Sequence, residues 1–101
     1  MFQTKIEIVG NTAEVKMIGD LDTNASEQFI ADVEKCLKQD VREVNFNMEQ
    51  LAFISSSGLR KLLAISKMVA AEGGALTVSN VSADIMQIFA LTGFDGLLGL
   101  K

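Results

Sequence analysis

The spacing of the apolar residues changes along this chain, and that change limits the folds it can adopt. Over residues 2–9, and again over residues 12–18, apolar and polar side chains alternate. Strict alternation is typical of β-strands that bury one face. Gly10-Asn11 separates the two runs and is a common two-residue turn. The chain is therefore predicted to begin with a β-hairpin.

Stretches with helical spacing then alternate with short apolar runs. Residues 25–39 carry apolar side chains at every third or fourth position, and Asn24 is predicted to cap this helix. A second helix is predicted to begin near Leu59 and a third at Ser82, each followed by glycine. Strands are predicted between the helices and near the end of the chain, over residues 42–47, 76–78 and 96–100, and a short apolar run over residues 51–54 leads into the second helix.

The order of these elements, β-β-α-β-α-β-α-β, predicts an α/β fold. Strands that alternate with helices form parallel pairs, while the opening hairpin adds an antiparallel pair. We therefore expect a mixed β-sheet with helices packed on it. The chain has 101 residues, 49% of them apolar and 22% charged, and it contains no proline and no linker-like stretch. That composition predicts a single domain over residues 1–101.

The composition also excludes several kinds of chemistry. The chain has no histidine and one cysteine, so histidine catalysis, disulfides and histidine or cysteine metal sites are excluded, and no cofactor is expected. Cys36 lies on an apolar helical stripe and is predicted to be a core residue. A net charge of −4 argues against binding to nucleic acid. No apolar run is long enough to insert in a membrane, and we expect a cytoplasmic protein that is a monomer when free.

Three serines and a glycine, residues 55–58, stand between a strand-like run and a predicted helix. A helix start presents unpaired N–H groups and the positive end of the helix dipole. A serine there is well placed to carry a phosphate, with Arg60 and Lys61 within one turn. Serine is also a common helix cap, so a purely structural role stays open. The stretch matches neither a G-x-S-x-G nucleophile motif nor a phosphate-binding P-loop.

Three stretches together resemble the STAS domain, and within it the bacterial anti-sigma factor antagonists (anti-anti-sigma factors). Gly19–Asp22 resembles the Gly-acidic-Leu-Asp stretch that follows the second strand of that family. Residues 44–59 resemble its apolar strand and its Asp-Ser-Ser/Thr-Gly-Leu signature, with Ser55 in the place of the usual Asp. Leu91–Phe94 resembles the glycine-containing end of its third helix. The likeness covers nearly the whole chain.

This resemblance implies a function in partner switching. Such a protein binds a serine-kinase anti-sigma factor and thereby frees a sigma factor for transcription. The kinase can instead phosphorylate it, which breaks the complex, and a PP2C-type phosphatase removes the phosphate. The family register implies phosphorylation at Ser57, with Ser56 and Ser55 as less favoured acceptors. Contacts with the partner are expected at Asp20, Asp22, Ser55, Ser56, Gly58, Arg60 and Lys61.

Other functions stay open for a chain with this resemblance. One is a constitutive STAS subunit of a lipid-transport ABC complex, and another is a scaffold in a different signalling complex. A small hydrolase or a nucleotide-binding enzyme fits the sequence least, because histidine and the phosphate-loop spacing are absent. We therefore expect a binding module and kinase substrate rather than an enzyme.

Overall fold

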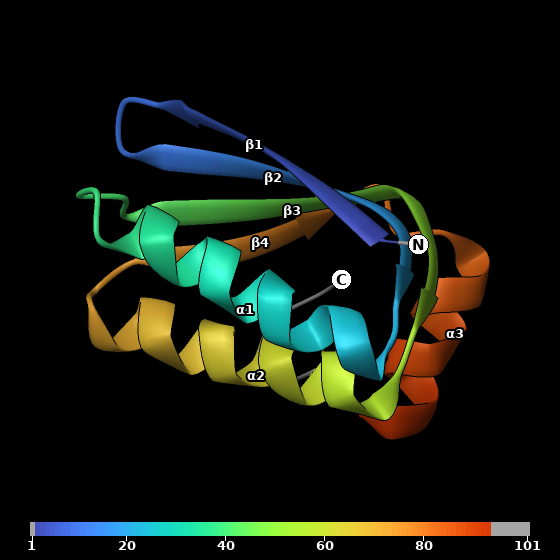
Figure 1. Cartoon of the computed structure of the whole chain (residues 1–101). Coiled ribbons are helices and arrows are strands. Elements are labelled where there is room, and N and C mark those ends of the chain that lie inside the picture. The colour runs from blue at the N-terminus through green and yellow to red at the C-terminus, as the bar shows by residue number, and fades with distance from the viewer. Residues whose placement is uncertain (1, 94–101) are drawn as a thin grey trace.

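The computed structural model describes residues 2–93. Its four strands form one mixed sheet in the order β1-β2-β3-β4 (Figure 1). β1 and β2 are antiparallel, whereas β2, β3 and β4 are mutually parallel, so the predicted mixed α/β fold is confirmed. The strand predicted at residues 96–100 lies outside the described residues. In chain order, the elements are β1 (Phe2–Val9), β2 (Thr12–Leu21), α1 (Thr23–Leu37), β3 (Glu43–Ile54), α2 (Ser56–Ala71), β4 (Ala75–Ser79) and α3 (Ala83–Thr92).

The helices leave one face of the sheet open. α1 and α2 lie side by side across one face, and α3 stands at the end of the sheet where β2 and β3 bend toward the helices (Figure 1). The other face carries polar and charged side chains from all four strands, including Lys5, Glu14, Asn45 and Thr77. None of the helices described over residues 2–93 has the length and apolarity needed to cross a bilayer.

A chain of three phenylalanine rings connects the helical layer to the sheet. Phe29 of α1 is fully buried and lies between Phe2 of β1 and Phe46 of β3. Its ring centroid is 5.8 Å from that of Phe2, in an edge-to-face arrangement, and 5.5 Å from that of Phe46. These separations are favourable for aromatic pairs. The rings therefore tie α1 to two strands that are not neighbours in the sheet.

The predicted β-hairpin is confirmed. β1 pairs with β2 along its whole length, from Phe2 opposite Gly19 to Val9 opposite Thr12. Gly10 has a φ of +62°, as the first central residue of a type II′ turn requires, and glycine adopts that angle without steric cost. β2 extends to Leu21, three residues beyond the predicted end at residue 18.

The prediction of separate runs at residues 42–47 and 51–54 is wrong, because both belong to the single long strand β3. Its pairing with β2 shifts register twice, between Lys16 and Ile18 and between Gly19 and Asp20. Such bulges place extra residues on β3 and change the phase of the buried side chains. Met48, which lies between the two predicted runs, is consequently a fully buried core residue.

Asp22, and not Asn24, caps α1. The Asp22 carboxylate accepts a hydrogen bond from the backbone N–H of Ala25 at 2.8 Å, while Asn24 lies inside the first helical turn. The helix accordingly starts and ends two residues before the predicted bounds of residues 25–39. The cause is the extension of β2 to Leu21, which leaves Asp22 as the residue where the chain turns from strand to helix.

Cys36 is a core residue, as its position on the helical stripe predicted. It is 4% exposed, on the face of α1 that meets the sheet. Burial, together with the nearby Asp32 carboxylate, raises the pKa of the Cys36 thiol above its usual value. The thiol therefore stays protonated at neutral pH and is a poor nucleophile.

Candidate functional site

The predicted serine segment lies where two parallel strands end side by side. Leu21 at the end of β2 is in register with Ile54 at the end of β3. The backbone N–H of Ser55 donates to the carbonyl of Leu21 at 2.9 Å. α1 and α2 therefore begin next to each other, and the first turns of both helices contribute to one surface (Figure 1).

Ser55 is the N-cap of α2. Its backbone is extended, and its hydroxyl oxygen accepts a hydrogen bond from the N–H of Gly58 at 3.0 Å. Its carbonyl accepts the first helical bond, from Leu59 at 2.9 Å. α2 thus begins at Ser56 and not near Leu59, and the hydroxyl of Ser55 is already used in holding the helix start.

Gly58 lets the start of α2 approach the strand ends closely. A Cβ at this position would lie 3.0 Å from Ile54 Cγ1 and 3.0 Å from Leu21 Cγ. Gly58 is buried and is therefore a packing residue of this junction. Its predicted contact with a partner stays a prediction.

Ser56 and Ser57 are the first two residues of α2, and they differ in exposure. Ser56 is exposed, whereas Ser57 is partly buried. Ser57 lines a shallow groove between the two helix starts, together with Thr23, Glu27, Arg60, Lys61 and Ala64. Both hydroxyls lie at the positive end of the α2 dipole, where a negative charge is stabilised.

An ion pair spans this groove. The Lys61 ammonium nitrogen lies 3.2 Å from the Glu27 carboxylate, with the two side chains 29% and 77% exposed. Because both groups are in contact with water, the pair stabilises the fold only modestly. Arg60 is exposed on the same turn of α2. The groove therefore holds two cations and one carboxylate beside the Ser57 hydroxyl.

The two aspartates of the predicted partner surface have different positions. Asp22 is engaged in capping α1, as described above. Asp20 lies in β2, partly buried, where it is in register with Phe53 of β3. The structure thus places Asp20 in a strand and Asp22 at a helix start, and their predicted contacts with a partner stay predictions.

Sequence reasoning missed two contributions to this surface. Glu27 and Thr23 come from α1, and nothing in the spacing of α1 and α2 indicates that their first turns meet. Phe53, within the apolar run at the end of β3, is 46% exposed. Its exposure follows from the second shift of register in β3, which turns Ile54 inward and leaves Phe53 at the surface two residues before Ser55.

Removing the cap is expected to weaken the start of α2. Ser55→Ala deletes the acceptor for the Gly58 N–H and should lower the free energy of unfolding by about 1 kcal/mol, measured by urea denaturation. Ser55→Asp is the matched control, because aspartate caps helices as well as serine does. Equal stability of Ser55→Ala and the unmodified chain would contradict the capping role.

Comparison with known proteins covers most of this chain. A family model for the STAS domain matches residues 3–101. The anti-sigma F factor antagonist of Lysinibacillus sphaericus is 28% identical over 87 residues, which cover 85% of this chain and 74% of that protein.

Solved structures of anti-sigma factor antagonists have the same architecture. The antagonist SpoIIAA in its unphosphorylated form superposes with a TM-score of 0.74 at 27% identity, covering 87% of this chain and 82% of that chain. The Bacillus cell fate determinant SpoIIAA in its phosphorylated form gives a TM-score of 0.73 at 28% identity, covering 96% and 86%. The sequence resemblance to this family is therefore supported by both sequence and structure.

Proposed function

This chain belongs to the STAS domain family, and from that premise we propose that it is an anti-sigma factor antagonist switched by phosphorylation. It binds a serine-kinase anti-sigma factor in the cytoplasm and frees the sigma factor which that protein holds. Phosphorylation in the first turn of α2 ends the binding, and a PP2C-type phosphatase restores it. The chain is a binding module and a substrate, not an enzyme. The observation that carries the proposal is the pair of serines that begins α2, in a chain similar to SpoIIAA, whose phosphorylated form is known.

The local chemistry supports a phosphate at this position. A phosphoserine adds about 1.5 to 2 negative charges at neutral pH and three acceptor oxygens. Arg60 and Lys61 follow Ser57 by three and four residues, which places their side chains on the same side of α2. The helix dipole and these cations would offset the new charge within the fold. A partner surface that fits the neutral serine would instead meet a dianion, and the complex would lose affinity.

Capping and exposure together distinguish the three candidate hydroxyls. Ser55 is the least suitable acceptor, because its hydroxyl oxygen already accepts the Gly58 N–H hydrogen bond that caps α2. Ser57 is the acceptor implied by the family resemblance, and it lies in the groove with Arg60 and Lys61. Ser56 is the more exposed of the remaining two and is the alternative that its accessibility favours. The proposal keeps Ser57 as the principal acceptor and tests Ser56 beside it.

The test is a phosphorylation assay with the serine-kinase anti-sigma factor of the same organism. The purified chain is incubated with that kinase and ATP, and the phosphate is located by intact-mass analysis and fragment mapping. We expect one phosphate, on Ser57, which is lost in Ser57→Ala and retained in Ser56→Ala. Phosphate that is lost in Ser56→Ala instead would keep the switch and move the acceptor to the exposed hydroxyl.

Binding to the same anti-sigma factor provides the second measurement. Ser57→Asp should weaken binding by at least about tenfold, since it places a charge in the contact surface, whereas Ser57→Ala should bind as the unmodified chain does. A chain that neither binds the kinase nor accepts phosphate would overturn the proposal. That result would favour a constitutive STAS subunit, and co-purification of a transporter ATPase would then be the next measurement.

A further inference from the structure

β1 is an edge strand whose outward backbone groups have no partner among the described elements. It pairs with β2 on one side, and none of the strands described over residues 2–93 lies on the other. The Glu43 N–H donates to the carbonyl of Asn11. The backbone N–H and C=O groups of the odd-numbered residues at this end of β2 therefore point toward β3. The pair Val9–Thr12 flanks the two-residue turn and is therefore hydrogen-bonded. By the antiparallel alternation, the backbone of the four even-numbered residues points outward from the edge: Phe2, Thr4, Ile6 and Ile8.

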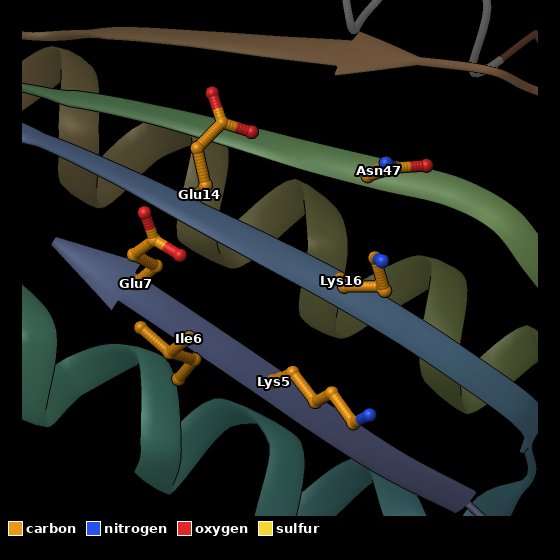
Figure 2. Close-up of a pocket in the computed structure, with 6 residues that line it drawn as sticks. All are labelled: Lys5, Ile6, Glu7, Glu14, Lys16 and Asn47. Carbon is orange, nitrogen blue, oxygen red and sulfur yellow. The ribbon is translucent and has the colours of Figure 1, made fainter. Parts of the chain in front are cut away.

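The open face of the hairpin pairs charges of like sign. Lys5 lies directly opposite Lys16, and Glu7 lies directly opposite Glu14. All four side chains are exposed on the face that carries no helix, and Figure 2 shows the two glutamates beside each other and the two lysines farther along the strands. Like charges directly opposite in a sheet are destabilising. Within residues 2–93, no ion pair joins either lysine to either glutamate.

The charges thus form two bands across β1 and β2, one positive and one negative. The repulsion within each band lowers the stability of the isolated chain. When a second copy is rotated by half a turn, its negative band lies beside the positive band of the first copy. Two further side chains near the turn, Ile8 and Val9, are 37% and 64% exposed, although both are large and apolar. Among residues 2–93, β1 therefore combines outward backbone groups without a partner, exposed apolar side chains and like charges opposite those of β2.

We propose that β1 is the contact surface for a second copy of this chain, which pairs with it as an antiparallel strand about a two-fold axis at Ile6. In this register Thr4 lies opposite the partner's Ile8, and both are residues with outward backbone groups. Lys5 lies opposite the partner's Glu7 at a position between hydrogen-bonded pairs, where side chains approach most closely. Across the contact between the two copies, Lys16 and Lys5 of one copy are then followed by Glu7 and Glu14 of the other.

The pairing is closed, because each copy uses β1 once and the two-fold axis makes the contact symmetric. It joins two four-stranded sheets into one continuous sheet with both open faces on the same side. A monomer was expected from the acidic net charge of −4. The net charge describes the whole surface, whereas the two charge bands on β1 and β2 attract the same bands of a rotated copy. The proposal does not depend on the function of the α2 serines.

Charge exchange between two variants tests the register. Lys5→Glu places glutamate opposite the partner's Glu7, and Glu7→Lys places lysine opposite the partner's Lys5. Sedimentation velocity over a wide concentration range should show that the unmodified chain dimerises. Each variant alone should have a dissociation constant raised at least about tenfold, because two attractive cross-strand pairs become repulsive. An equimolar mixture should form a heterodimer, because its cross-strand pairs are again opposite in sign.

Lys67→Glu is the matched control. It changes the net charge by the same amount as Lys5→Glu, from an exposed position on α2 away from the sheet, and should leave dimerisation unchanged. Circular dichroism confirms that each variant is folded. A mixture that stays as dissociated as its two components would overturn the proposal, as would a monomeric unmodified chain at every concentration. Neither result affects the proposed phosphorylation switch, because the phosphorylation assay tests the serines at the start of α2 and not β1.

Discussion

Replacing Phe29 by alanine is expected to lower the free energy of unfolding by about 3–5 kcal/mol. The ring is fully buried between Phe2 and Phe46, so its removal loses apolar burial and leaves a cavity. The two neighbouring rings belong to β1 and β3, and both strands are held in place by their pairing with β2, so they cannot move inward to fill the space. Urea denaturation followed by circular dichroism measures the effect. For a domain of this size, the loss is a large part of the total stability.

Phe53→Ala is the control for the same chemical change at the surface. That ring is 46% exposed, so its truncation should cost about 1 kcal/mol or less. The contrast between the two variants separates burial from residue type. Similar losses at positions 29 and 53 would show that the aromatic chain is not the centre of the core.

Replacing Gly74 by alanine is expected to destabilise the fold by about 3 kcal/mol. A Cβ at this position would lie 2.1 Å from the carbonyl oxygen of Arg42, and backbone atoms cannot move away as a flexible side chain can. The same carbonyl accepts a hydrogen bond from the N–H of Ala75 at 2.9 Å. The substitution therefore disturbs the point where the chain leaves α2 and enters β4. Thermal or urea unfolding measures the loss.

Gly93→Ala separates steric overlap from backbone strain. Gly93 has a φ of +79° at the end of α3, and a Cβ there would meet no atom of the described residues within 4 Å. Alanine at this position should cost roughly 1 kcal/mol, the strain of a left-handed conformation. If Gly74→Ala cost no more than Gly93→Ala, the close approach to Arg42 would not control the stability of this junction.

Local patterns were sufficient to predict the hairpin, the order of the elements and the position of the serines. The alternation around Gly10-Asn11 depends only on neighbouring residues, and the turn chemistry agrees with it. The sequence predicted the start of α2 near Leu59 and left a serine cap open as an alternative; Ser55 is that cap, and the helix begins at Ser56. These features are determined over a few residues and are therefore visible in the sequence.

The errors come from interactions between distant parts of the chain. The continuity of β3 through Met48 depends on its pairing with β2, and the bulges in that pairing break the alternation that marks a strand. Asp22 became the cap of α1 because β2 continues to Leu21. The position of Glu27 beside Lys61 depends on two strands ending together, which no spacing within either helix reports.

The passage from strand to helix takes a single residue at both helix starts. Asp22 alone links β2 to α1, and Ser55 alone links β3 to α2, with the Ser55 N–H bound to Leu21. Neither junction contains slack, so a group attached to the first turn of α2 has no hinge through which to rearrange the backbone. A phosphate at this point, as proposed, would change the charge of the surface and leave the backbone conformation unchanged. A binding partner must therefore contact the phosphate directly to respond to it. A protein that contacts only distant parts of the domain would bind the two forms equally.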